Sequence, residues 1–206
     1  MEKEITLVFH NEGLRSYIEV DLCAECPRQD DKGCCGFYSP VFYPTDLAYL
    51  YINQPDLIDY IFKQDQLTIL ETSVTVNNDK DGDSYRCKFH SRDRGCLLSQ
   101  RQRETICRHF VCPGIDWQRE KTMQHWKDFF ICLFNYEIEL NDRFSDDLTA
   151  RGLTLRIPSL REQFMRELVQ LYTLELEQLP HFFNTTPSIE VFKIKRPIEW
   201  GKNWCL

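Results

Sequence analysis

The sequence predicts an α+β fold, in which small β-hairpins and loops in the N-terminal half are covered by a C-terminal helical layer. Before residue 90, segments of alternating polarity flank turn-forming residues, which is typical of hairpins. After Pro113, apolar residues recur at helical spacing. We expect a cysteine-cluster region with its N-terminal hairpin over 1–114 and a helical region over 115–206, packed together as one compact unit.

In the N-terminal half, the pattern predicts two hairpins separated by two short helices. The first hairpin has a turn at Asn11-Glu12-Gly13, and the second has a polar connection in which Gly82 is expected at positive φ. Thr45 suits an N-cap, and Pro55 suits a first helical turn. The predicted ranges are 4–21 and 67–89 for the hairpins, and 45–53 and 55–64 for the helices.

In the C-terminal half, apolar residues that recur every three or four positions predict amphipathic helices. Cys132 lies within one of these apolar runs, so we expect it to be a buried thiol. The next helix is expected to start with a capping box of Ser159 and Glu162. The predicted elements are helices over 117–139 and 145–151, a helix after Pro158, and an extended segment over 189–194.

Charge and hydropathy exclude several classes of partner. The N-terminal apolar run is too short for a signal peptide, and no stretch approaches the ~20 apolar residues needed to span a bilayer. We therefore expect a cytoplasmic protein with no membrane partner. The net charge of −7 argues against a general nucleic-acid binder, and no feature identifies a protein partner.

Eight of the ten cysteines lie in two compact blocks, which are the most informative feature of the chain. In a reducing cytoplasm disulfides are rare, so clustered thiols indicate metal ligands or redox groups. Thiolates suit zinc and iron–sulfur clusters, and short loops bring such ligands together. The candidate ligands are Cys23, Cys26, Cys34 and Cys35 in the first block and Cys87, Cys96, Cys107 and Cys112 in the second.

Adjacent cysteines seldom bind one zinc ion together. The pair Cys34-Cys35 therefore indicates either two neighbouring sites, or one ligand beside a supporting thiol. His90 and His109 could replace a cysteine at zinc, but they rank below the cysteines. We set Cys205 aside because it lies one residue from the end of the chain.

A basic segment overlaps the second cysteine block. Residues 86–108 carry seven lysines and arginines against two acidic residues, a local balance of +5. Three interpretations are open: a solvated surface, a phosphate-binding patch, or arginines that offset the charge of metal-bound thiolates. In the last case Arg108 could also donate hydrogen bonds to ligand sulfurs.

The motif pattern resembles the YkgJ-like cysteine-cluster family, described as a putative zinc- or iron-chelating domain with a CxxCxxCC signature. The resemblance covers residues 23–113, and all eight clustered cysteines find a counterpart. The gap between Cys26 and Cys34 is seven residues, longer than in the signature, and Arg103-Glu104 stands where Arg-Pro is usual. The matching motifs are Cys23-x2-Cys26, Gly33-Cys34-Cys35, Asp46, Cys87-Lys88-Phe89, Gly95-Cys96 and Cys107-Arg108-His109-Phe110-Val111-Cys112.

The resemblance implies metal chelation by these cysteines, and it supplies no reaction. Our leading hypothesis is a metal-binding protein that chelates zinc, preferred slightly, or iron, including an iron–sulfur cluster. A second hypothesis is an enzyme, either a thiol redox protein that uses Cys23-x2-Cys26 or a transferase, although no catalytic residue can be named. A third is a nucleic-acid or protein adaptor that uses the basic segment 86–108.

Overall fold

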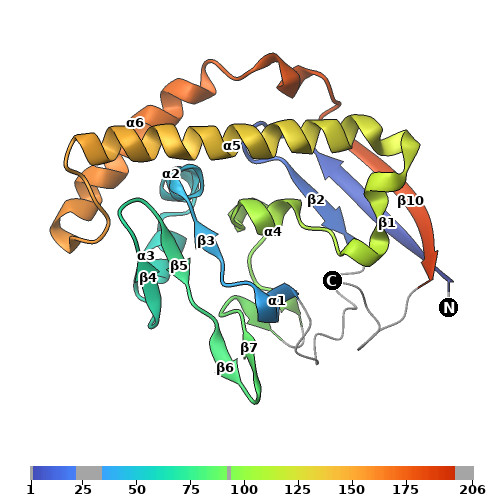
Figure 1. Cartoon of the computed structure of the whole chain (residues 1–206), viewed down its shortest axis with the longest axis horizontal. Helices are drawn as coiled ribbons and strands as arrows, with labels where there is room; N and C mark the ends of the chain where they lie inside the picture. Colours follow the sequence, from blue (N-terminus) through green and yellow to red (C-terminus); the bar gives the residue numbers. More distant parts are fainter. Residues whose placement is uncertain (1, 22–33, 92–93, 198–206) are drawn as a thin grey trace.

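A long helix and a three-stranded sheet organise the part of the chain that the computed structural model describes. That part comprises residues 2–21, 34–91 and 94–197, without the side chains of Cys34 and Phe37. The fold is α+β: helices and several small sheets share one hydrophobic core (Figure 1). Among the described residues, no helix is long and apolar enough to cross a membrane.

The main sheet joins the two ends of the described chain. Strand β1 (Glu2–His10) lies between β2 (Tyr17–Val20) and β10 (Ile189–Pro197), and both pairings are antiparallel. The predicted N-terminal hairpin is therefore confirmed. The extended segment predicted over 189–194 is also a strand, and its Ile194 lies opposite Ile5 of β1.

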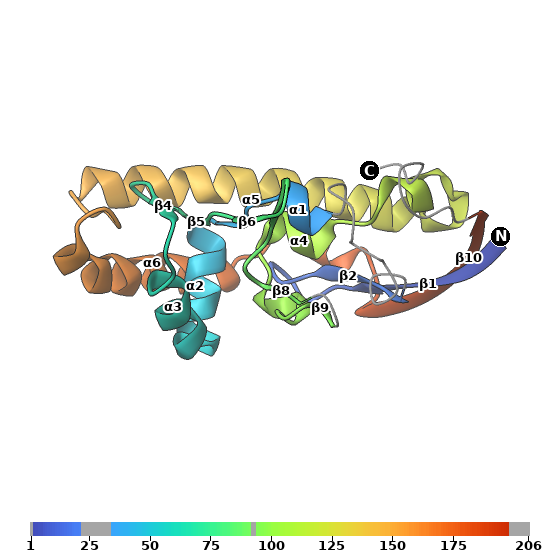
Figure 2. The same ribbon diagram turned by 90° about the horizontal axis from the view of Figure 1, so that it is seen from below.

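One face of this sheet packs against α5 (Gln124–Ala150), which lies along one long side of the molecule while β1 and β2 lie on the other (Figure 2). Phe9 is fully buried, and its ring stacks on Trp126 with the centroids 5.1 Å apart. Trp117 meets the same ring edge-on at 4.9 Å. Such aromatic pairs stabilise the contact beyond the area that they bury.

Helix α5 corrects two expectations. It has 27 residues and spans the gap between the predicted helices 117–139 and 145–151, which are therefore one element. Polar residues near Asn141 interrupt the apolar pattern, but no Pro or Gly breaks the helix between 124 and 150. Residues 113–123 instead form three short 3₁₀ turns: η3 (Pro113–Ile115), η4 (Trp117–Arg119) and η5 (Lys121–Met123).

The expectation that Cys132 is buried is also wrong. Cys132 is exposed on α5, and its neighbour Phe134 is 42% exposed, whereas Leu133 between them is fully buried. Successive helical residues point about 100° apart, so a residue inside an apolar run can face away from the core.

Two further helices pack against α5, α2 (Pro44–Asn53) and α6 (Arg161–Leu176), and α3 (Pro55–Phe62) packs against α2. Helix α3 begins at Pro55, as predicted. Two predicted caps are wrong: Thr45 lies inside the first turn of α2, after the N-cap Tyr43, and α6 has Leu160 rather than Ser159 at its N-cap. Ser159 belongs to the preceding 3₁₀ turn η6 (Pro158–Leu160), which moves the helix start beyond it.

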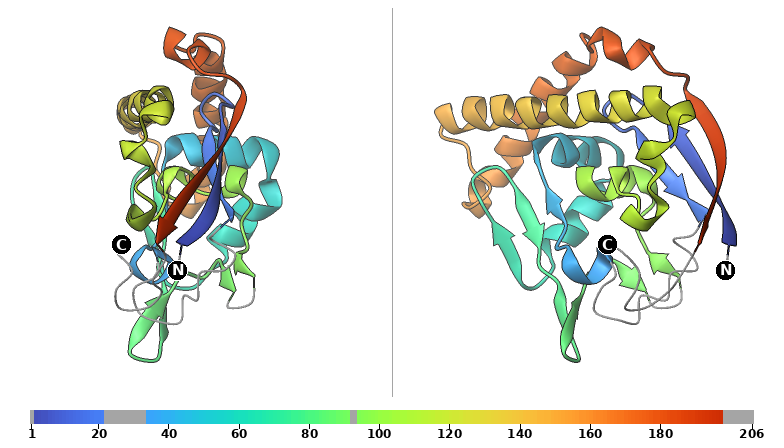
Figure 3. Two further views of the ribbon diagram at one scale, coloured as in Figure 1. Left: turned by 90° about the vertical axis from the view of Figure 1, so that its right-hand side faces the viewer. Right: turned by 45° about the vertical axis from the view of Figure 1, so that its right-hand side comes forward.

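The remaining strands form small sheets below α5. Strands β3 (Val41–Phe42), β5 (Val74–Val76) and β4 (Leu67–Ile69) form one antiparallel sheet, whereas β6 (Asp79–Asp81) pairs with β7 (Ser84–Arg86). The predicted hairpin over 67–89 is therefore two hairpins. Gly82 has a φ of +66°, as expected, in the turn of the second, which projects away from α5 (Figure 3).

Candidate metal centre

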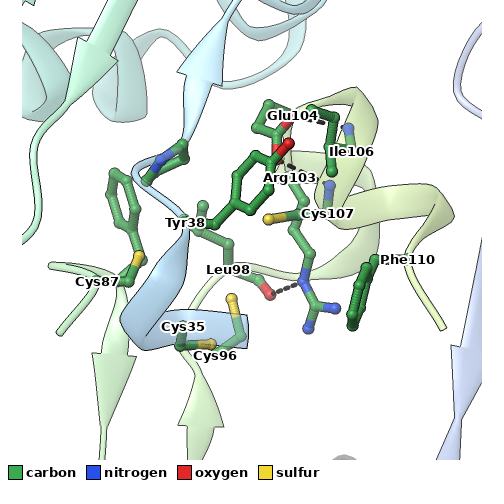
Figure 4. A pocket seen from close by; sticks show the side chains of 12 residues that line it. Cys35, Tyr38, Cys87, Cys96, Leu98, Arg103, Glu104, Ile106, Cys107 and Phe110 are labelled. Carbon is green, nitrogen blue, oxygen red and sulfur yellow. Dashed lines mark hydrogen bonds between the residues drawn. The ribbon is translucent and has the colours of Figure 1, made fainter. Parts of the chain in front are cut away.

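Four of the predicted cysteine ligands line one cavity of about 70 Å³ below α5: Cys35, Cys87, Cys96 and Cys107. They come from both sequence blocks and from separate elements. Cys35 lies in α1 (Cys34–Phe37), Cys96 in β9 (Gly95–Cys96) and Cys107 in α4 (Thr105–His109), and Cys87 follows β7. In Figure 4, Cys35, Cys96 and Cys107 extend toward a common space, and Cys87 lies on the other side of the α1 ribbon.

Hydrogen bonds hold together the segments that carry the two cysteine blocks. The amide of Cys87 donates to the carbonyl of Cys35 at 2.6 Å, so the first block is fixed directly against the second. The side-chain amide of Asn78 donates to the carbonyl of Gly36 at 3.1 Å. Strand β8 (His90–Ser91) pairs with β9 and places Cys96 opposite His90. These contacts position the thiols without a covalent link.

Cys107 is positioned by Glu104, the N-cap of α4. The Glu104 carboxylate accepts hydrogen bonds from the amides of Ile106, at 2.7 Å, and Cys107, at 2.8 Å. This is the usual way in which an acidic N-cap satisfies the free amides of a first helical turn. Burial raises the pKa of Glu104, and the negative charge of Asp46 acts in the same direction, while hydrogen bonds from Cys107 and the two amides oppose them.

The rest of the cavity wall is apolar apart from Arg103 and Glu104. Phe89, Leu98 and Phe110 line it together with Tyr38 and Ile106. The Arg103 guanidinium is held by a hydrogen bond from its Nε to the carbonyl of Leu98 at 3.2 Å (Figure 4). An apolar wall excludes water and strengthens electrostatic interactions, so the positive charge of Arg103 favours a negatively charged group in this cavity.

Other predicted site residues lie elsewhere or outside the described residues. Cys23 and Cys26 fall outside them, as does the side chain of Cys34. Cys112 is half-buried against the hydrophobic core, and His90 is buried. Neither Cys112 nor His90 is among the described residues that line the cavity.

Arg108 and His109 face a different environment from the cysteines. Arg108 is fully buried and donates to the Glu137 carboxylate at 2.5 Å and to the carbonyl of Ser16 at 2.8 Å. Burial lowers the pKa of His109 well below its usual value, and the positive charges of Arg108 and Arg15 lower it further. His109 is therefore neutral, beside the Phe130 ring at 5.0 Å.

Sequence reasoning missed this buried charge network, which joins five segments of the chain. Arg15 donates to Asp46 at 2.7 Å and to the carbonyls of Arg101 and Arg103, and Arg108 lies 3.7 Å from the same Asp46 carboxylate. The arginines thus fix the loop that leads from Cys96 to Cys107. The only signal in the sequence is that Glu137 falls on the apolar stripe of α5, eleven residues after Trp126.

Several cations of the basic segment 86–108 have carboxylate partners within the described part of the protein. Lys88 contacts Asp65 and Asp79, and Arg101 forms a two-point ion pair with Glu12. Arg103 and Arg108 have the partners described above. These contacts support neither a phosphate patch nor compensation of thiolate charge by Arg108; Arg103 is the arginine that lines the cavity.

The donor set fits a metal that prefers sulfur, but the described residues do not complete a site. Thiolates are soft ligands for zinc and for iron–sulfur clusters. Among the residues that the structure describes, no group of three or more His, Cys, Asp or Glu side chains is arranged to hold an ion. A complete site would require the cavity cysteines to move closer together, or further ligands to join them.

Comparisons with protein-family models, curated proteins and solved structures gave no match.

We expect the stability of the protein to decrease as pH rises from about 5 to about 8, because burial raises the pKa of Glu137 to about 7. The unfolded chain releases this proton near pH ~4.3, so the folded state binds more protons between those values. The protonated form contributes roughly 3 kcal/mol of stability, which is lost as pH rises through 7.

Urea unfolding at the two pH values checks this expectation. Glu137→Gln cannot ionise, so its free energy of unfolding should depend less on pH than that of the wild type. Equal pH dependence in the two proteins would show that Glu137 does not titrate in this range.

Proposed function

We propose that this protein binds a metal through its clustered cysteines, with zinc or iron, including an iron–sulfur cluster, as the metal. Cys35, Cys87, Cys96 and Cys107 are the core of the proposed site. Cys23, Cys26, Cys34 and Cys112 are the further candidate ligands.

The observation that carries the proposal is the shared cavity. Cys35 and Cys107 are separated by more than 70 positions in the sequence, yet both line it. Structural cysteines in a hydrophobic core are usually dispersed among apolar side chains, where burial keeps them inert. Four thiols around one small apolar cavity, beside an arginine, are typical of a ligand set for a soft metal.

The resemblance to the YkgJ-like family supports the same conclusion independently of the cavity. It depends on the order and spacing of the cysteines, including the first block. Taken together, spacing and cavity favour one centre, or two neighbouring centres, built by both blocks.

Metal analysis of anaerobically purified protein tests the proposal. Zinc has no visible absorption because its d shell is full, so a colourless protein with stoichiometric zinc identifies a zinc site. An iron–sulfur cluster would give a coloured protein that contains iron and sulfide. Protein that contains neither metal, and takes up neither when supplied with Zn²⁺ or with Fe²⁺ and sulfide, would contradict the proposal.

A further inference from the structure

A second cavity, of about 420 Å³, lies between α5 and the starts of α2 and α4. Its volume falls within the ~300–1,000 Å³ usual for small-molecule sites. It has only Ile106 in common with the cysteine cavity, so it is a separate feature. Its wall includes Thr72, Phe134, Glu137, Ile138, Asp142 and Ser145.

The charged groups of this wall are all of one sign. It contains two carboxylates, Glu137 and Asp142, and among the described residues no lysine, arginine or histidine lines it. Phe134 and Ile138 supply an apolar surface, and they are 42% and 46% exposed although they lie beside a cavity. A cavity with an anionic group and an apolar wall favours a ligand with a positive charge and an apolar part.

Glu137 carries an unsatisfied acceptor. Its side chain is 1% exposed; Oε1 accepts from Arg108, and Oε2 has no hydrogen-bond partner among the described residues. The His109 Nε2 atom lies 3.8 Å from Oε2, beyond hydrogen-bond distance. A buried acceptor without a donor is costly, and native proteins normally satisfy it with protein, water or a ligand.

A metal ion fits this cavity less well than an organic cation. Within the described residues, no third carboxylate, histidine or cysteine joins Glu137 and Asp142 in a group that could hold an ion. The hydroxyls of Thr72 and Ser145 bond to each other at 2.8 Å. An ammonium group can satisfy a carboxylate with a single charge-assisted hydrogen bond and needs no complete ligand shell.

We propose that this cavity binds a small organic ammonium ion, whose N–H group donates to Glu137 and whose apolar part packs on Phe134 and Ile138. Asp142, exposed on the next turn of α5, attracts the same charge. The site is independent of the cysteine cavity and does not depend on the metal proposal.

Phenethylammonium is a suitable probe, and 2-phenylethanol is its neutral control with the same apolar part. We expect calorimetric or NMR titration of the full chain at pH 8, where Glu137 is ionised, to show that the amine binds at least about tenfold more tightly than the alcohol, as a charge-assisted hydrogen bond requires. Glu137→Gln and Asp142→Asn should each weaken amine binding, Glu137→Gln by about tenfold.

Asp146→Asn is the matched control, because Asp146 is exposed on the same helix but does not line the cavity. It removes the same charge as Asp142→Asn and should leave binding unchanged. Because Asp142 is exposed, its replacement tests the site even if the Glu137 variant does not fold. Equal binding of amine and alcohol, or an equal effect of the two aspartate variants, would overturn the proposal. Nα-acetyl-lysine amide mimics a lysine side chain of a partner protein. If it bound at least tenfold more tightly than phenethylammonium, the assignment of the cavity to a free small amine would be overturned.

Discussion

Replacing Cys107 with serine should remove most of the metal that we propose this protein binds. A serine hydroxyl is a poor ligand for zinc or iron at neutral pH, because it does not ionise as a thiol does. Changes in residues that merely support a ligand lower metal affinity by about 10–100-fold, so loss of a ligand itself should lower it by more than about 100-fold. Metal content and affinity, measured after anaerobic purification, check this result.

Cys132→Ser is the matched control, since Cys132 is a cysteine on the exposed face of α5. This variant should keep its metal. Circular dichroism distinguishes a folded protein without metal from one that has lost its structure. If folded Cys107→Ser and Cys87→Ser variants both retained the full metal content, the cavity cysteines would not be the ligands.

Replacing Arg108 with methionine should lower the free energy of unfolding by about 3–5 kcal/mol near pH 8. The change leaves the carboxylates of Glu137 and Asp46 buried without their shared arginine. The loss should be smaller near pH 5, because Glu137 is protonated there and no longer requires a cation. Urea unfolding, with both proteins at the same metal content, measures the difference.

Two further variants test whether the loss comes from the buried charge. Adding Glu137→Leu to Arg108→Met removes the unpaired carboxylate and should restore part of the stability. Arg151→Met breaks an ion pair with Asp147 in which both side chains are at least 40% exposed, and should cost less than about 1 kcal/mol. A loss for Arg108→Met as small as that for Arg151→Met would contradict the role of this network.

The local elements were predictable because their signals lie in neighbouring residues. Alternation around Gly13 gives the β1–β2 hairpin, and Pro55 marks the start of α3. The prediction of helix ends failed where a contact between distant parts of the chain determined the structure. The polar residues around Asn141 suggested the end of a helix, yet Asn141 is buried and its side chain accepts a hydrogen bond from the amide of Thr45 in α2.

For the candidate site, the sequence identified which residue type carries the chemistry but not its neighbours. The spacing of the cysteines identified all four that line the cavity. Glu104 was noted only as a departure from a motif, and Glu137 lay unnoticed in an apolar stripe. A carboxylate can be buried only when a partner is close, and the partner of Glu137, Arg108, is 29 positions away.

The sequence by itself determined the class of fold, most of the local elements and the clustering of eight cysteines in two blocks. Those properties depend on side-chain periodicity and on short spacings along the chain. The tertiary structure decided the pairing of β10 with β1 and the convergence of Cys35, Cys87, Cys96 and Cys107 on one cavity. It also placed the Arg108 guanidinium against the Glu137 carboxylate. Each of these joins residues far apart in the sequence, which local periodicity cannot reveal. The strand pairing and the ion pair form because buried backbone polar groups and buried charges need partners in space.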